Sequence, residues 1–246
     1  MSRLGRLRSE TRAATRAFLR RRTAVFFTFF FPVIIVVIFG VLIQTRPGGG
    51  GLFTEPPSYY VPGYLAVVVL FTPLSRVGSE VARHRDGNRF EKLATTPLTR
   101  TEWLLAQTVV NVVVIGLAGL LLLFLMVGVT GASIRPSPLL LPFVVLGVGL
   151  FCGIGAVIGS LASSQDGVIS ASNGIALPLL FLSETFVPPT LLPGWLPTWL
   201  SPLTYFSRGV RAATTGVGEA AVPLAVLAVC SIVAFAVAAR LLPRTD

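Results

Sequence analysis

Charged and metal-binding residues are scarce in this sequence of 246 residues. Charged residues make up 12% of the chain, about half of the roughly 25% that is usual for a soluble domain. Hydrophobic residues make up 53%, the mean hydropathy is +0.81, and the apolar residues gather in long blocks. This composition excludes a soluble enzyme and predicts a polytopic membrane protein.

The chain also lacks the residues that most catalytic sites need. Its single lysine, Lys92, precedes Leu93 and follows no glycine-rich loop, so the phosphate-binding sequence G-x-x-x-x-G-K-[ST] is absent. One histidine, His84, and two cysteines, Cys152 and Cys230, are too few for a usual His/Cys zinc site. The acidic residues stand at block ends or in loops without a paired motif. We therefore expect no catalytic residue, metal or cofactor in this chain, with an intramembrane lipid-modifying enzyme as a remote alternative.

Six apolar blocks are long enough to cross a hydrocarbon core, which takes about 20 helical residues. They cover about 23–43, 59–75, 104–127, 139–160, 168–187 and 220–241, and the fifth is the least hydrophobic. The sequence thus predicts an all-α fold in which residues 1–246 form a single membrane domain with six transmembrane helices.

Basic residues are divided unequally between the two sides that six spans define. Sixteen Lys and Arg residues precede the first span, lie between the second and third, or follow the sixth. Only Arg46, Arg135, Arg208 and Arg211 lie on the opposite side. Because basic loops stay in the cytoplasm, we expect both termini to be cytoplasmic. The net charge of +10 then reflects topology and contact with anionic membrane lipids, and we expect no nucleic-acid partner.

The segment before the first span has a helical pattern. Leu4, Leu7, Thr11, Ala14 and Phe18 follow alternating spacings of three and four residues, and arginines occupy most of the remaining circumference. Such an amphipathic helix can lie at the membrane interface. Two interpretations stay open: an elbow helix coupled to moving parts, or an anchor that only fixes the topology.

The longest polar segment, 76–103, lies between the second and third blocks. It is too short to form a domain, and it mixes both charge signs. Asp86-Gly87-Asn88 predicts a turn with a short helix on either side, and Thr99 or Thr101 is a candidate N-cap for the next helix. Mixed charge together with an apolar residue such as Phe90 or Leu93 favours docking onto a soluble partner, and a solvated connector is the alternative.

Two sets of residues carry a family resemblance. One set runs from Glu80 through Gly87 to the segment T-P-L (96–98) and Arg100. The other combines the segments L-S-x-x-F-x-P (182–188), L-P-x-W (192–195) and P-L-T-Y (202–205) with Arg211. Together they resemble the permease subunits of the ABC type-2 transporter family, and the resemblance covers nearly the whole chain.

The resemblance implies a permease that pairs with itself or with a sister permease above two cytoplasmic ATP-binding subunits, which would hold ATP and Mg²⁺. It also implies a coupling helix that inserts into a groove of the ATPase. The residues of this coupling helix are Arg83, His84, Arg85, Asp86, Gly87, Asn88, Phe90, Glu91 and Leu93. Glu184 departs from the family pattern, because many relatives carry a small residue there.

Residues 186–211 would, by the same resemblance, form short re-entrant helices on the outer side. Prolines at 188, 189, 193, 197 and 202 forbid one continuous helix there. Trp195, Trp199 and Tyr205 keep the segment apolar enough for the membrane interface. Irregular backbone is not tolerated in lipid, so the segment must fold into protein or lie at headgroup depth. A loosely held outer loop is the alternative.

Polar residues inside the predicted spans are candidates for a substrate pathway. They are Gln107, Asn111, Asn173, Ser183 and Glu184. Amide side chains in membranes also serve as hydrogen-bonding contacts between helices, and this alternative stays open. The pairs Gly149/Gly153 and Gly155/Gly159 predict that the fourth span packs closely against its neighbours.

With the resemblance, the sequence predicts the permease subunit of an ATP-driven exporter in a prokaryotic plasma membrane. Polar groups in the middle of the spans are sparse, which favours a hydrophobic or amphipathic substrate, such as a drug or a lipid-like molecule. Export of a polysaccharide or lipid-linked glycan is the alternative. A pure assembly or receptor protein is a further alternative, and such a protein would not need a loop that transmits energy.

Overall fold

The computed structural model describes residues 2–38 and 55–243, and the regular elements of these residues are all helices. In chain order they are α1 (Arg3–Arg20), α2 (Arg22–Val36), η2 (Pro57–Tyr60), α3 (Val61–Asp86), α4 (Arg89–Leu93), α5 (Arg100–Thr130), α6 (Leu140–Leu161), α7 (Gln165–Phe181), η3 (Pro189–Leu191), η4 (Thr198–Leu200), α8 (Pro202–Thr215) and α9 (Ala221–Leu241). The predicted all-α fold is confirmed for the described residues.

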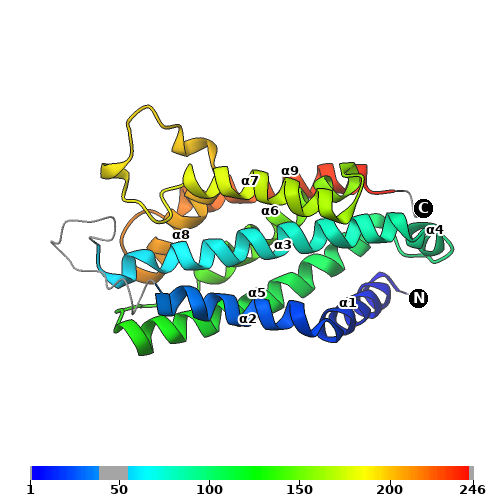
Figure 1. Cartoon of the computed structure of the whole chain (residues 1–246), viewed down its shortest axis with the longest axis horizontal. Coiled ribbons are helices and arrows are strands. Elements are labelled where there is room, and N and C mark those ends of the chain that lie inside the picture. Colours follow the sequence, from blue (N-terminus) through cyan, green and yellow to red (C-terminus); the bar gives the residue numbers. More distant parts are fainter. Residues whose placement is uncertain (1, 39–54, 244–246) are drawn as a thin grey trace.

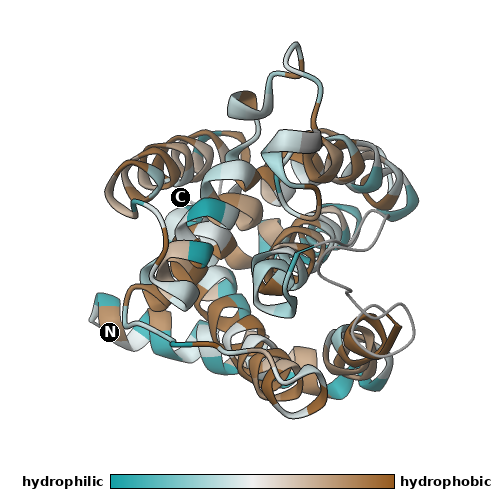
Figure 2. Cartoon of the chain, turned by 90° about the vertical axis from the view of Figure 1, so that its left-hand side faces the viewer, coloured by the Kyte–Doolittle hydropathy of each residue, from teal (hydrophilic) through white to brown (hydrophobic). Residues whose placement is uncertain are grey.

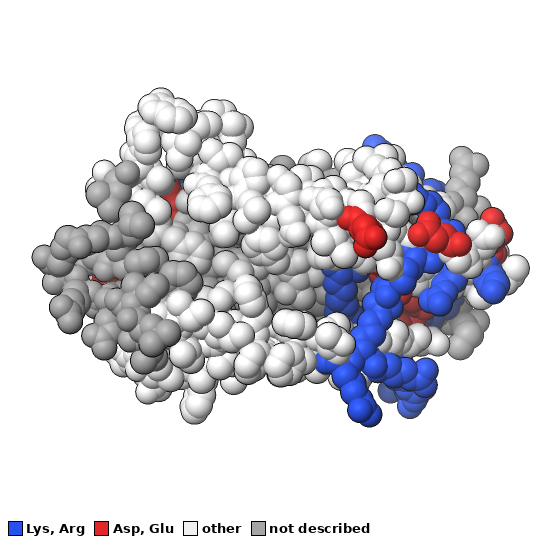
Figure 3. All heavy atoms as spheres, viewed as in Figure 1, with Lys and Arg blue, Asp and Glu red and all other residues white. Residues whose placement is uncertain are grey.

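The helices α2, α3, α5, α6, α7 and α9 run along the long axis of the molecule as a bundle (Figure 1). The view along that axis shows apolar ribbon on most of them (Figure 2). Both described ends of the chain lie at one end of the bundle, because Arg6 bonds Glu102 and Arg100 donates to the carbonyl of Leu242. Lys and Arg side chains gather at this same end, around α4 (Figure 3).

Within residues 2–38 and 55–243, four helical segments are long and apolar enough to cross a membrane, judged by length and composition. They are Pro57–Asp86, Arg100–Thr130, Leu140–Leu161 and Ala221–Leu241. The fifth predicted span corresponds to α7, which is shorter at 17 residues. The first begins with α2, whose 15 residues form a shorter apolar helix, and residues 39–43 of that span lie outside the described part of the chain.

Helix α3 extends further than the sequence predicted. The second span was expected to end near residue 75, whereas α3 continues through 76–86. No proline lies between Ser75 and Asp86, and the turn comes only at Gly87 and Asn88, where Asn88 adopts a left-handed conformation with φ of 51°. The predicted turn at 86–88 is therefore confirmed, and the first half of segment 76–103 is part of a long helix.

The start of α5 matches its predicted cap. The Thr99 side chain accepts a hydrogen bond from the backbone N–H of Glu102, and the Glu102 side chain accepts one from the backbone N–H of Thr99. This reciprocal pair is a capping box, which satisfies two backbone donors at the helix start. Glu102 also accepts from Arg6 at 2.7 Å, so the same carboxylate holds α1 against α5.

Helix α6 packs closely on α3 and α9, as its glycines predicted. A methyl group added at Gly155 would overlap the carbonyl group of Leu74, and one at Gly159 would overlap the carbonyl of Gly78. On the other side of α6, a methyl group at Gly153 would meet the backbone of Ala234 in α9. Small residues let helix backbones approach in this way, and α6 therefore forms the centre of the bundle.

We predict that Gly155→Ala separates α3 from α6 and lowers stability by about 1–3 kcal/mol, the usual cost of overpacking. The measurement is the melting temperature of the purified chain in a neutral detergent. Gly128→Ala in α5 is the matched control, because nothing lies within 4 Å of the added methyl group. That change should leave the melting temperature equal or slightly higher, since alanine favours helices over glycine. Equal melting of both variants would contradict the close approach of α3 and α6.

Candidate functional site

The turn and short helix between α3 and α5 form a compact projection, here called the tip (residues 86–93). Its inner face is held by Phe90, which is 4% exposed. The Phe90 ring lies 5.4 Å from the ring of Trp103 and 5.4 Å from that of His84, measured between centroids. His84 and Trp103 lie 5.3 Å apart. The three rings come from α4, α5 and α3, so aromatic packing fixes the tip to both long helices.

Glu80, on α3, organises the cationic side chains next to the tip. Its carboxylate pairs with Arg83, lies 3.1 Å from the guanidinium of Arg21 and lies 3.5 Å from Nδ1 of His84. His84 Nδ1 is also 2.9 Å from the backbone carbonyl of Glu80. Arg83 and His84 are therefore engaged within the molecule.

Arg85 connects the end of α3 to the end of α6. Its guanidinium donates to the carbonyl of Ser160 at 3.0 Å and also to the carbonyl of Ala162. The last carbonyls of a helix have no partner within the helix, and a cation is favoured there by the helix dipole. This contact adds α6 to the two helices that hold the tip.

The structure thus divides the predicted coupling residues into two groups. Arg83, His84, Arg85 and Phe90 contact the body of the protein, and Leu93 is partly buried. The exposed group comprises Asp86, Gly87, Asn88 and Glu91, together with Arg89 and Lys92. Phe90 was expected to offer an apolar docking contact, and this expectation is wrong, because its ring is enclosed by His84 and Trp103.

Two of the predicted pathway residues meet on α5. Asn111 is fully buried and donates to the carbonyl of Gln107 at 2.8 Å. Its side-chain oxygen accepts a hydrogen bond from Arg76 of α3 at 3.1 Å. Asn111 therefore links α3 to α5, which is the interhelical alternative that the sequence left open. The sequence analysis assigned Arg76 to a cytoplasmic loop, whereas it lies within α3. The signal that was missed is the absence of proline between Ser75 and Asp86.

Asn173 lies elsewhere, on an exposed face of α7. It lines a groove of about 480 Å³ that also contacts α2 and α3, here called the α2–α3 groove. Arg76 lines the same groove from the α3 side. The groove thus brings one predicted pathway residue close to a cation that the sequence analysis had not singled out.

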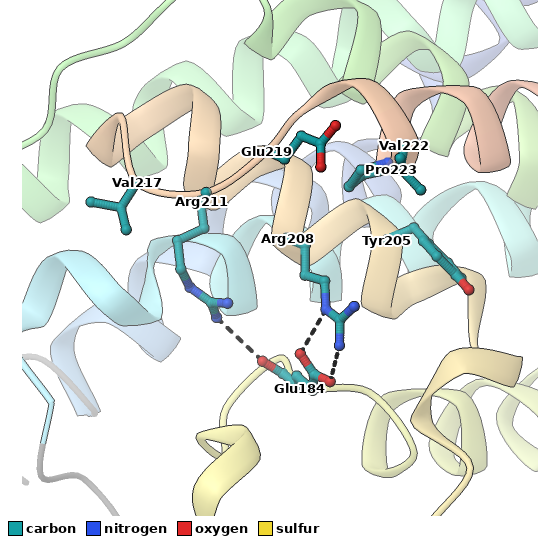
Figure 4. A pocket seen from close by; sticks show the side chains of 9 residues that line it. Glu184, Tyr205, Arg208, Arg211, Val217, Glu219, Val222 and Pro223 are labelled. Atoms are coloured by element: carbon teal, nitrogen blue, oxygen red, sulfur yellow. Dashed lines mark hydrogen bonds and ion pairs between the residues drawn. The ribbon is translucent and has the colours of Figure 1, made fainter.

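Ser183 and Glu184 lie at the opposite end of the bundle from the tip. Glu184 is 4% exposed and accepts hydrogen bonds from both Nε and a terminal nitrogen of Arg208, the Nε contact being 2.9 Å (Figure 4). Arg211 donates to the Glu184 carbonyl at 3.3 Å and stacks over Tyr59 at 4.1 Å. The bond to Glu184 raises the pKa of Arg208, whereas burial lowers that of Arg211. Both arginines remain charged at neutral pH.

Glu184 also contacts the proline-rich segment, because Thr198 donates to its carboxylate at 3.2 Å. It borders a pocket of about 460 Å³ that Arg208, Arg211 and Glu219 also line (Figure 4). Ser183 bonds the carbonyl of Leu180 at 2.6 Å. These side chains connect α7, η4 and α8, so the segment after α7 is tied to the bundle. The predicted pathway residues therefore lie in three separate places.

The geometry defines an all-helical, multi-pass membrane protein with a fixed polar tip at its basic end. Comparison with known families agrees: the family model described as "ABC-2 type transporter" matches residues 7–214. The chain belongs to the ABC-2 type transporter family.

Curated relatives include the "Probable multidrug ABC transporter permease YbhR" of Escherichia coli (strain K12) and that of Escherichia coli O157:H7. Each is 24% identical over 152 residues, which cover 61% of this chain and 41% of the relative. The matched region therefore spans about two fifths of the length of these relatives.

We predict that Phe90→Ala detaches the tip and lowers stability by about 3 kcal/mol, because a buried aromatic ring is replaced by a cavity. The melting temperature of the purified chain measures this loss. Lys92→Ala is the control, since Lys92 lies on the exposed face of the same short helix and its change should stay within about 0.5 kcal/mol. A Phe90→Ala protein as stable as the control would show that the ring does not hold the tip.

A second prediction concerns Glu184. Replacement by glutamine removes the charge that pairs with Arg208 and should cost about 1.5–3 kcal/mol, the range for hydrogen bonds to charged groups. Glu219→Gln is the matched control, because Glu219 borders the same pocket and is exposed. Urea or thermal unfolding of both variants gives the comparison. The assignment fails if the two substitutions have the same effect.

Proposed function

We propose that this chain is the permease subunit of an ATP-driven ABC exporter that moves a hydrophobic or amphipathic substrate out of the cell. Two separate ATP-binding subunits would supply the energy, with ATP and Mg²⁺ bound to them. Two copies of the permease, or this chain and a sister permease, would form the transport unit. Membership of the ABC-2 type transporter family supports this function, as does the similarity to a relative named as a probable multidrug ABC transporter permease.

In this proposal six helices cross a prokaryotic plasma membrane, with the tip and both termini in the cytoplasm. The concentration of Lys and Arg at one end supports this orientation (Figure 3), because basic segments remain on the cytoplasmic side. Helix α1, an amphipathic helix bound to α5 through Arg6 and Glu102, would lie at the inner interface. The segment from Phe186 to Arg211 would fold back into the outer leaflet.

The observation that carries the proposal is the construction of the tip. Its exposed face is polar and of mixed charge, while its inner face is fixed to α5 by Phe90 and its base to α6 by Arg85. A partner that moves such a projection must also move the helices to which it is fixed. Rigid-body motion of packed helices is an established way to switch a protein between two states. The ATP-binding subunits would bias this motion through different contacts in each state.

The decisive test reverses the charges on the exposed face of the tip. The double variant Arg89→Glu, Lys92→Glu should insert and fold normally, because both side chains are exposed. It should lose at least tenfold in affinity for the ATP-binding subunit and should abolish substrate-stimulated ATPase activity, since unfavourable charge contacts oppose docking. Co-purification and ATPase assays of the reconstituted complex measure both effects.

Arg135→Glu is the matched control, because Arg135 is exposed at the other end of the bundle. It reverses a charge of the same type far from the tip and should leave the complex intact. Normal complex formation and normal stimulation in the double variant would refute the docking role of the tip. Arg85 is less suitable for this test, because its substitution would also break the bonds to Ser160 and Ala162. A change in docking could then not be separated from a change in stability.

A further inference from the structure

The α2–α3 groove has a basic end and an aromatic end. Helices α2 and α3 run in opposite directions beside each other (Figure 1), so the start of α2 lies next to the end of α3. Arg21 and Arg83 accordingly line one end of the groove, and Phe31 and Phe71 line the other. From Arg21 to Phe31 the α2 wall extends about 15 Å, at 1.5 Å per residue. The groove thus changes from cationic to apolar over the length of an amphiphilic molecule.

Arg76 is the cation whose charge is least compensated in this groove. Its guanidinium is partly buried, donates to the Asn111 side-chain oxygen at 3.1 Å and lies 4.3 Å from the centre of the Phe18 ring. Within the described part of the chain, no carboxylate forms an ion pair with it. A cation taken out of water without an opposing charge is costly. An anion in the groove would supply that charge.

The neighbouring cations do not receive full compensation from the protein either. Arg21 and Arg83 share the single carboxylate of Glu80. Glu10 is the other nearby acid, and its pKa is raised by burial first and by the charge of Glu80 second. Even with Glu10 ionised, three guanidinium groups face two carboxylates. Among the residues that the structure describes, no acidic residue lines the groove itself.

The opposite part of the groove suits an apolar group. Phe27 and Phe31 are 58% and 45% exposed, and Phe71 lies across from them on α3. Thr72 and Ser75, between the aromatic and the basic end, offer hydroxyl groups for hydrogen bonds. A volume of about 480 Å³ is within the range of pockets for drug-sized ligands, and it is small for a phospholipid with two acyl chains.

We propose that the α2–α3 groove binds the exported substrate, and that this substrate is an anionic amphiphile with one apolar tail or ring system. Its negative group pairs with Arg76 next to Arg21 and Arg83, and its apolar part lies along Phe27, Phe31 and Phe71. The inference deepens the proposed function and rests on it for the conclusion that the occupant is cargo. A cationic drug is excluded as the preferred ligand by the sign of the groove.

The test measures binding of radiolabelled dodecyl phosphate to the full chain in nanodiscs of phosphatidylcholine, without ATP-binding subunits. Arg76→Gln removes the charge but keeps a polar group that can bond Asn111, and Arg76→Lys restores the charge. Arg135→Gln is the control, because it removes an exposed arginine far from the groove. The melting temperature of each variant shows whether it is folded.

We expect Arg76→Gln to bind dodecyl phosphate at least tenfold more weakly, since a charge-assisted contact is lost. Arg76→Lys should remain within about threefold of the original protein and Arg135→Gln should be unchanged, because both keep a positive charge at residue 76. Unlabelled dodecyltrimethylammonium, of equal tail length and opposite charge, should not compete. Unchanged binding by Arg76→Gln, or equal competition by the cation, would overturn the proposal.

Phosphatidylglycerol added to the nanodiscs distinguishes cargo from a resident lipid. If it displaces the label as well as unlabelled dodecyl phosphate does, the groove holds a phospholipid and the assignment to cargo is wrong. This assay contains no ATPase, so its outcome is independent of the tip. If the original protein does not bind dodecyl phosphate but couples normally to the ATPase, only the groove is refuted. If it binds dodecyl phosphate through Arg76 but shows no ATPase coupling, only the exporter mechanism is refuted.

Discussion

The backbone contact between α3 and α6 determines the arrangement of both ends of this protein. Gly155 and Gly159 allow α6 to approach the carbonyls of Leu74 and Gly78, and side-chain packing in membranes depends on such close approach because lipid provides no hydrophobic drive between helices. This contact fixes the direction of α3 over its whole length. The carboxyl end of α6 then lies within reach of Arg85, and the opposite face of α3 remains available to α2 and the groove.

Charge compensation differs between the two ends of the bundle. At the end opposite the tip, the buried carboxylate of Glu184 accepts hydrogen bonds from Arg208 and Thr198, and its backbone carbonyl accepts one from Arg211, so the chain itself satisfies this residue. At the basic end, the guanidinium groups outnumber the nearby carboxylates, and Arg76 relies on an amide and an aromatic ring. A self-sufficient ion pair suits a structural clamp, whereas an under-compensated cation beside an open groove suits the recognition of something external.

Local signals in the sequence predicted local structure well. Thr99 and Glu102 form the expected cap, and Gly87 and Asn88 form the expected turn, because both depend on residues that are neighbours in the chain. The glycines of α6 likewise indicated close packing, although their partners could not be named.

The enclosure of Phe90 was missed. Whether an aromatic residue in a polar segment faces inwards depends on its neighbours, here His84 and Trp103, which lie on other helices. The clamp at Glu184 was missed for the same reason, because Arg208 follows 24 residues later. Contacts between side chains on different helices can be predicted only when the arrangement of the helices is known.

The exposure of Lys92 has a practical consequence for labelling. It is the single lysine of the chain, and it lies on the exposed face of α4, so its ε-amine is a natural chemical handle on the tip. Apart from the α-amine, an amine-directed fluorophore or cross-linker has no other attachment point on this chain. A label attached to Lys92 would therefore report from the surface where the ATP-binding subunits would dock, and no engineered cysteine is needed.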